Sequence, residues 1–257
     1  MIHLFWLMIS LTWRDRYPKK IFFITDMLSS LLDVIFYYFT SEAFGRAFSS
    51  QNYFQYVIWG EIVIAIPMIL FLSSTKALRS SLIEGTWEIL LMNPHPLYKI
   101  LFRLQWGEYF REVCRLILMV GLALILGAQF HFHDVLKAML LILISAPLFW
   151  NLGLLSATLF IYTGRGLGAV QHLSHFATIL AGVYFPLTVF PSWLLYSSLL
   201  LSPWTWLIEA SRKESFDYKT TFIFMGASLI LSFLGPWVFT KGLKNLAKTG
   251  RRLQLIN

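Results

Sequence analysis

One polar segment separates two long apolar stretches of the chain, and it reads Arg79-Ser-Ser-Leu-Ile-Glu-Gly-Thr-Trp-Glu-Ile-Leu-Leu-Met-Asn-Pro94. Its apolar residues recur every three to five positions, as on one face of a helix: Leu82, Ile83, Trp87, Leu90 and Leu91. The acidic residues Glu84 and Glu88 fall largely outside this face. Asn93-Pro94 is expected to end the helix, because proline disfavours helical geometry in the residue before it. The segment therefore predicts an amphipathic helix that either lies on lipid or docks a soluble partner.

The composition identifies a membrane protein. The chain has 257 residues, of which 57% are hydrophobic and only 13% are charged, whereas soluble domains have about 25% charged residues. Several apolar stretches of roughly 20 residues are each long enough to cross a hydrocarbon core of ~30 Å as a helix. A transmembrane β-barrel would show shorter, alternating segments. The net charge of +8 is expected to orient the chain and contact anionic lipid, and we expect no nucleic-acid partner.

The expected fold is all-α, a single transmembrane domain over residues 1–257. Six spans are predicted, at residues 21–40, 53–72, 106–127, 138–162, 169–185 and 220–240. Residues 1–20 predict an interfacial helix and residues 76–104 a cytoplasmic coupling region. Residues 186–207 contain three prolines and are too interrupted to span, which favours a pair of re-entrant half-helices. Most Lys and Arg residues fall on the side of both termini, so the positive-inside rule predicts cytoplasmic termini.

Three carboxylates lie inside the first two predicted spans: Asp26 and Asp33 in the first and Glu61 in the second. A charge at membrane depth is costly and faces either a partner or a cavity. These residues therefore either pair within the bundle, for example with Arg111 or Arg115, or line a translocation pathway. The first half of span three alternates acidic and basic residues at spacings of three and four, which predicts intrahelical ion pairs.

No catalytic, cofactor-binding or metal-binding residue is expected on this chain. A Gly-x-x-x-x-Gly-Lys-Ser/Thr phosphate-binding loop is missing from the sequence, so nucleotide hydrolysis is not expected. His131, His133 and Asp134 share one short loop that offers no fourth zinc ligand. His172 and His175 share a face of span five, where they serve either as a proton relay or as hydrogen-bonding groups between helices.

Three segments resemble the transmembrane permease subunit of a type-2 ABC exporter (the ABC-2 family). Glu84-Gly-Thr-Trp-Glu-Ile-Leu-Leu-Met-Asn-Pro94 is similar to that family's segment around its coupling helix. Gly182-Val-Tyr-Phe-Pro-Leu-Thr-Val-Phe-Pro-Ser-Trp-Leu194 is similar to the signature that leads into its re-entrant half-helices. Ser202-Pro-Trp-Thr-Trp-Leu-Ile-Glu-Ala-Ser-Arg212 resembles the stretch that follows. The order of the predicted elements also agrees from end to end.

The resemblance implies a permease without enzymatic activity of its own, in a bacterial cytoplasmic (inner) membrane. Its expected partners are two copies of a cytoplasmic ABC ATPase, which would hold the ATP and Mg, and a second permease subunit, identical or related, with which it forms a dimer. The implied substrate is lipid-linked, polysaccharide or hydrophobic and drug-like. The implied coupling residues are Glu84, Gly85, Thr86, Trp87 and Glu88. The implied re-entrant motif contains Gly182, Phe185, Pro186, Pro191 and Trp193, and the implied pathway contains Asp26, Asp33 and Glu61.

A second class of function fits the ionisable residues. A proton-coupled secondary transporter would use Asp26, Asp33 and Glu61 together with the histidines of span five. Such transporters often show internal repeats with matched broken segments, whereas this sequence has one broken region. A membrane-embedded enzyme would need reactive groups that converge at one depth, and the sequence offers no convincing set.

Overall fold

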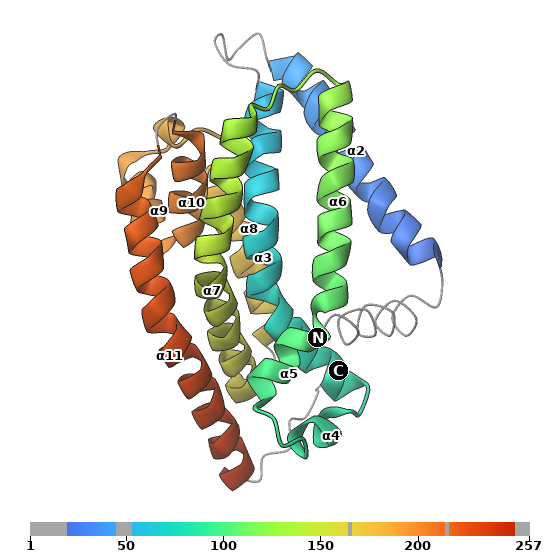
Figure 1. The fold of residues 1–257 in the computed structure, drawn as a ribbon, viewed down its shortest axis with the longest axis vertical. Helices are drawn as coiled ribbons and strands as arrows, with labels where there is room; N and C mark the ends of the chain where they lie inside the picture. Colours follow the sequence, from blue (N-terminus) through green and yellow to red (C-terminus); the bar gives the residue numbers. More distant parts are fainter. Residues whose placement is uncertain (1–19, 45–52, 164–165, 214–215, 250–257) are drawn as a thin grey trace.

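The computed structural model describes residues 20–44, 53–163, 166–213 and 216–249, and these residues form helices and turns without a strand. The all-α class is therefore confirmed (Figure 1). The interfacial helix expected over residues 1–20 lies outside the described residues except for Lys20, as does the basic C-terminal end beyond residue 249. The described helices are α2 (Lys20–Phe44), α3 (Tyr53–Ile83), α4 (Trp87–Leu91), α5 (Leu97–Leu104), α6 (Trp106–Ile125), α7 (Phe132–Thr163), α8 (Gly166–Leu180), η1 (Leu187–Val189), α9 (Ser192–Leu201), α10 (Pro203–Arg212) and α11 (Tyr218–Thr249).

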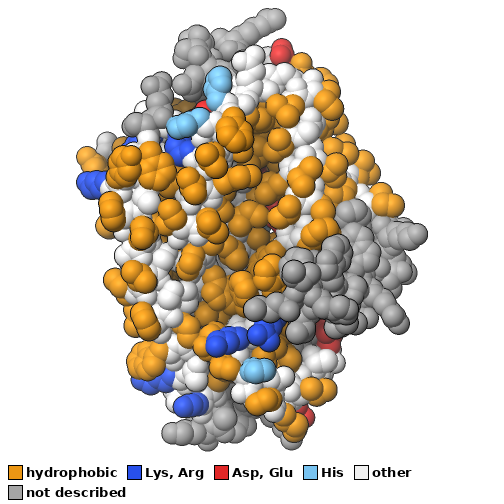
Figure 2. All heavy atoms as spheres, in the orientation of Figure 1, with side chains coloured by type: hydrophobic (Ala, Val, Ile, Leu, Met, Phe, Trp, Pro, Cys, Tyr) orange, Lys and Arg blue, Asp and Glu red, His pale blue; other side chains and the backbone are white. Residues whose placement is uncertain are grey.

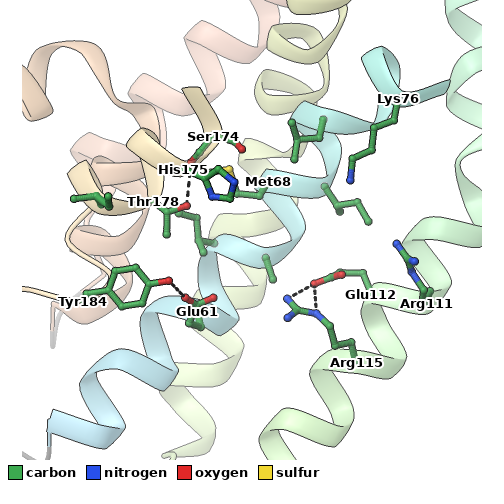
Figure 3. Close-up of a pocket in the computed structure, with 15 residues that line it drawn as sticks. Glu61, Met68, Lys76, Arg111, Glu112, Arg115, Ser174, His175, Thr178 and Tyr184 are labelled. Atoms are coloured by element: carbon green, nitrogen blue, oxygen red, sulfur yellow. Dashed lines mark hydrogen bonds and ion pairs between the residues drawn. The ribbon is translucent and has the colours of Figure 1, made fainter. Parts of the chain in front are cut away.

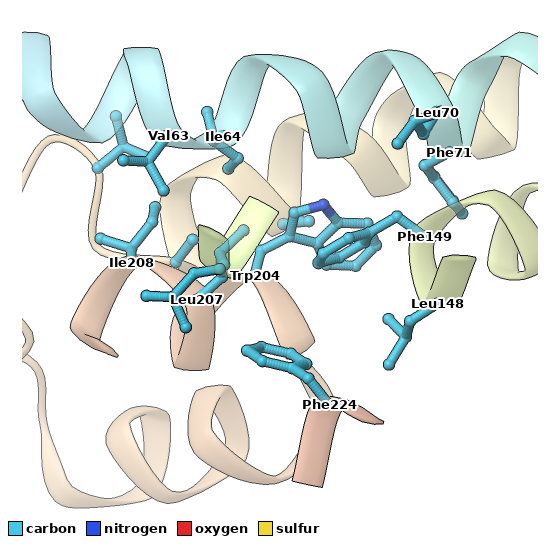
Figure 4. Packing of buried hydrophobic residues seen from close by; sticks show 14 of the residues in the cluster. Val63, Ile64, Leu70, Phe71, Leu148, Phe149, Trp204, Leu207, Ile208 and Phe224 are labelled. Atoms are coloured by element: carbon cyan, nitrogen blue, oxygen red, sulfur yellow. The ribbon is translucent and has the colours of Figure 1, made fainter. Parts of the chain in front are cut away.

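Three long helices form the centre of the bundle. α7 packs against α3 on one side and along α11 on the other, while α8 and α10 cover the groove between α3 and α7. α6 packs on α3, and α2 crosses α6 at an angle at the outer edge of the bundle (Figure 1). The main hydrophobic core lies where α3, α7 and α10 meet, with the ring of Trp204 5.2 Å from those of Phe71 and Phe149 (Figure 4).

Within the described residues, α3, α7 and α11 are long and apolar enough to cross a membrane. Hydrophobic side chains cover the middle of one face of the molecule, and Lys, Arg and His side chains lie towards its two ends (Figure 2). The other three expected spans differ, because α2 carries charged residues along its length, α6 carries four in its first half, and α8 has only 15 residues, about 22 Å of helix. Membrane character is thus supported, while the arrangement of six spans stays a prediction.

The amphipathic segment does not form one helix, so the prediction of a single amphipathic helix within this segment was wrong. α3 runs on to Ile83, the chain turns at Gly85, and a separate helix, α4, begins at Trp87. Gly85 has a φ of 69°, a left-handed conformation that glycine adopts without the steric penalty of a side chain. The expected second span is correspondingly longer, since α3 has 31 residues, or about 46 Å of helix.

The proline-rich region over residues 186–207 forms two short helices, α9 and α10, preceded by η1. Pro186 and Pro191 precede η1 and α9, where the missing amide hydrogen costs no helical bond. Ser202 caps α10 by accepting a hydrogen bond from the Thr205 amide at 3.3 Å. α10 is buried against α3 and α7, whereas α9 exposes Trp193, Tyr196 and Leu200. Whether this pair of helices is re-entrant in a membrane stays a prediction.

Glycines permit close approach between the central helices. A Cβ atom on Gly153 of α7 would lie 2.6 Å from the carbonyl oxygen of Phe71 and 2.8 Å from that of Leu70, both in the α3 backbone. On the other side of α7, the Asn151 side chain lies where a Cβ on Gly235 of α11 would be. The absence of a side chain therefore sets the spacing of α3, α7 and α11.

Candidate functional site

A cavity of about 420 Å³ lies between α3, α6 and α8 (Figure 3). One part of its wall is apolar and comes mostly from α3; it includes Ile64, Ala65, Met68, Ile69 and Leu72. The polar part contains residues of all three helices and of the segment after α8: Glu61, Lys76, Arg111, Glu112, Arg115, Ser174, His175, Thr178 and Tyr184. A pocket with an apolar wall and a few convergent polar groups is the usual form of a small-molecule site.

Glu61 lies at one end of this cavity and is held by two tyrosines. Its Oε1 atom accepts hydrogen bonds from the Tyr184 hydroxyl at 2.7 Å and from the Tyr37 hydroxyl at 3.3 Å. The rings of these two tyrosines are 6.1 Å apart. No hydrogen bond to the Oε2 atom of Glu61 and no cation within ion-pair distance is present among the described residues. Glu61 is thus the one predicted pathway residue that lines this cavity.

The charged residues of α6 form the intrahelical ion pairs that their spacing predicts. Arg111 pairs with Glu108, and the Nε of Arg115 donates to Glu112 Oε1 at 2.9 Å. Arg111 also forms an ion pair with Asp26 of α2 at 2.8 Å. This pair joins two helices that are distant in sequence, and it shows that Asp26 shares Arg111 with Glu108 within the bundle.

Asp33 belongs to a second, smaller cavity of about 190 Å³ between α2 and α6. This smaller cavity is also lined by Asp26 and by three α6 residues that line the large cavity too: Arg111, Glu112 and Arg115. Both cavities therefore border the charged part of α6. The Asp33 side chain is exposed on α2 and has no ion-pair partner among the described residues. The structure therefore does not bring Asp33 into the cavity that contains Glu61.

The two histidines of the fifth predicted span have different surroundings in the structure. His175 lines the large cavity, while His172, three residues earlier on α8, is exposed and does not line it. His133 and Asp134, which were expected in a loop, both lie in the first turn of α7, with 3.9 Å between His133 Nδ1 and Asp134 Oδ1. Within the described residues, no group of three or more His, Cys, Asp or Glu side chains is arranged to hold a metal ion.

The predicted coupling residues lie on a platform formed by α4 and α5 at the C-terminal end of α3 (Figure 1). Its inner side is apolar: Leu97 and Leu101 are buried against α3 and α7, and Trp87 and Leu90 pack on the same cluster. Glu84 and Glu88 are exposed on its outer side, beside Ile89 and Met92, which are 69% and 83% exposed. Thr86 bonds back to the Ser81 carbonyl and joins the platform to α3.

The residues of the predicted re-entrant motif follow α8. Gly182 has a φ of 76°, so it turns the chain away from α8, and Pro186 and Pro191 directly precede the next two helices as their N-caps. Phe185 and Trp193 are exposed, Trp193 to 71%.

Arg212, at the C-terminal end of α10, is a structural residue that sequence reasoning missed. Its Nη1 atom donates to the Tyr56 hydroxyl at 2.6 Å and to the Gly182 carbonyl at 2.8 Å, and its Nη2 atom donates to the Tyr56 carbonyl at 3.1 Å. The guanidinium also lies 3.6 Å from the centre of the Tyr56 ring. Arg212 therefore joins α10 to α3 and to the turn after α8. The sequence shows only an arginine near the end of an apolar region.

Comparison with protein-family models finds no match to this chain, and comparison with curated proteins finds no match either. The family resemblance therefore rests on the three sequence segments given above, and the function is argued from the geometry of the cavity and the platform.

Proposed function

We propose that this protein is the permease subunit of an ATP-driven ABC exporter that works as a dimer with a separate ATPase. In this proposal the polar cavity belongs to the translocation pathway, and the α4–α5 platform transmits movement from the ATPase. The chain has no phosphate-binding loop, so the energy for transport comes from the partner, which carries ATP and Mg. The proposed location is a bacterial inner membrane with cytoplasmic termini.

The single observation that carries this proposal is the two-sided character of the platform. α3 is about 46 Å long, which is roughly 16 Å more than a hydrocarbon core, so its C-terminal turns and the platform would extend beyond the membrane. The inner side of the platform is fixed to the bundle by buried leucines, and its outer side combines two carboxylates with exposed Ile89 and Met92. A surface that is fixed to the bundle and carries both charged and apolar side chains suits a contact with a soluble partner better than burial in lipid.

Coupling requires that the ATPase make different contacts with the platform in different nucleotide states. Because the platform packs on α3 and α3 also lines the cavity, a displacement of the platform would reach the cavity through one continuous helix. This continuity supports a role of the platform in transmission as well as in attachment.

One observation favours the alternative of a proton-coupled secondary transporter. Glu61 and His175 line the same cavity from different helices, and pairs of this kind serve as proton relays in transporters. Asp26 is less suited to that role, because it is held in an ion pair with Arg111.

The test of the proposed function is purification of the tagged, full-length chain from its native membrane in mild detergent, followed by mass spectrometry. A stoichiometric ABC ATPase supports the exporter. A chain that reproducibly lacks an ATPase in more than one detergent contradicts it and favours the proton-coupled alternative.

A charge-reversal variant tests the docking surface itself. Glu84→Lys combined with Glu88→Lys is expected to weaken association with the ATPase at least about tenfold, because it reverses both exposed carboxylates of the platform without touching its buried side. Glu42→Lys reverses an exposed carboxylate of α2 and serves as the matched control. Equal amounts of co-purified ATPase in all three proteins would show that the platform is not the docking surface.

A further inference from the structure

Among the described residues, no cation lies within ion-pair distance of Glu61, although Glu61 lies on a helix that is apolar enough to cross a membrane. Both of its hydrogen-bond donors are neutral tyrosine hydroxyls, and both use the same carboxylate oxygen. The other oxygen is bonded to no described residue, while Glu61 itself lines the cavity. A carboxylate at membrane depth is costly unless a proton or a cation neutralises it. The Glu61 carboxylate is therefore a suitable binding partner for a positively charged group.

The large cavity is lined by two carboxylates, Glu61 and Glu112, and by three basic side chains, Lys76, Arg111 and Arg115. Arg111 is shared between Asp26 and Glu108, neither of which lines this cavity, so the lining residues and their ion-pair partners together hold four carboxylates against three basic groups. Both arginines are already paired with carboxylates. Arg115 faces Glu61 across the cavity and is held by Glu112 (Figure 3). Lys76 lies at the far end, since residues 61 and 76 are separated by about 22 Å along a helix.

The surroundings of Glu61 suit an organic cation better than a metal ion. The ring of Tyr184, which lines the cavity, lies beside the carboxylate, and aromatic rings attract cations through their faces. Beyond the carboxylate, α3 presents an apolar wall that includes Ile64, Ala65 and Met68. This wall can cover the apolar part of a ligand whose positive group lies against Glu61.

We propose that the cavity between α3, α6 and α8 binds amphipathic organic cations, with Glu61 as the counter-ion, Tyr184 as the aromatic part of the wall and the apolar face of α3 as the surface for the ligand's body. As a substrate class for export, this inference rests on the proposed transport function. It narrows the expected range of cargo to positively charged, hydrophobic compounds.

Two probes of the same shape and opposite charge test this proposal. Binding of radiolabelled tetraphenylphosphonium, a cation, and tetraphenylborate, an anion, is measured by equilibrium dialysis with the full-length chain in lipid nanodiscs. Glu61→Gln is expected to weaken binding of the cation at least about tenfold and to change binding of the anion less than twofold. Partition of each probe into lipid is the same for every variant and cancels in the comparison.

Two further variants separate charge from folding. Glu61→Asp keeps the charge and is expected to keep the cation affinity within about threefold, whereas Glu42→Gln removes an exposed charge from α2 and is expected to change neither probe. Unchanged cation binding in Glu61→Gln, an equal loss of both probes, or a loss in Glu61→Asp as large as in Glu61→Gln would each overturn the proposal. Because binding needs no ATPase, a failed ATPase capture together with Glu61-dependent binding would contradict the exporter and leave the cation site standing.

Discussion

Replacement of Gly153 by alanine tests the close packing that holds the central helices together. The new Cβ atom would lie 2.6 Å and 2.8 Å from two carbonyl oxygens of α3, and neither can move aside because both belong to a helical backbone. Overpacking in a well-packed interior costs about 1–3 kcal/mol. Alanine recovers about 0.5–1 kcal/mol over glycine within a helix. The difference between these two ranges is about 0–2.5 kcal/mol, and its centre, about 1–1.5 kcal/mol, is the expected net loss in the free energy of unfolding.

The measurement is thermal unfolding of the purified protein in detergent, followed by the loss of the monodisperse peak in size-exclusion chromatography. For a chain of this length, the expected decrease in Tm is about 3–6 °C. Gly226→Ala on α11 is the matched control, because a Cβ at that glycine meets no atom within 4 Å; this variant is expected to unfold at or slightly above the temperature of the original protein.

A Gly153→Ala protein as stable as the Gly226→Ala control would refute this reasoning. It would mean that α3 and α7 are farther apart than their carbonyl and glycine positions indicate. A decrease in both variants would instead point to a general effect of alanine in these helices and would also contradict the steric argument.

Two further predictions concern the end of the bundle at which α10 and α11 meet. Asp217→Ala should lower stability by about 1 kcal/mol, because Asp217 caps α11 through the Thr220 amide at 3.2 Å. The hydrogen bond from Lys213 and the bonds from Thr220 lower the pKa of Asp217 from 3.8 to about 2. The contribution of the Asp217 carboxylate to the stability of the folded protein is therefore full above about pH 4 and is lost as the pH falls through 2. Asp217→Ala and the original protein should accordingly converge in thermal stability at low pH. Arg212→Lys should cost about 1–3 kcal/mol, since an ammonium does not reproduce the fork that reaches Tyr56 and Gly182 together; a Tm equal to that of the original protein would show that this contact is dispensable.

The helical class and the membrane character follow from composition and from features that act over one or two turns. The long apolar stretches of α3, α7 and α11 require helices, because a backbone in lipid must satisfy its own hydrogen bonds. The ion pairs of Arg111 with Glu108 and of Arg115 with Glu112 follow from a spacing of three residues. These features depend on neighbours in the sequence, so the sequence is sufficient to predict them.

The break at Gly85 is a feature that the spacing of apolar residues did not predict. The apolar spacing of residues 82–91 fits one helix, and Leu82, Trp87 and Leu90 do pack on one hydrophobic cluster. They reach it from two helices, because a left-handed glycine turns the chain between them. Periodicity reports which residues face the core, but it does not report whether the backbone between them is continuous.

The candidate site depended almost entirely on tertiary structure. The sequence identified Asp26, Asp33 and Glu61 as a group of carboxylates within predicted spans, yet the three have different surroundings: Asp26 is paired with Arg111, Asp33 is exposed, and Glu61 accepts bonds from Tyr37 and Tyr184. Those surroundings come from α2, α6 and the segment after α8, which the chain brings together only on folding. The sequence by itself determined that charges are placed in a membrane protein. The packing of helices decided that Asp26 pairs with Arg111 and that Glu61, alone of the three carboxylates, lines the larger cavity, because electrostatic partners are chosen by distance in space.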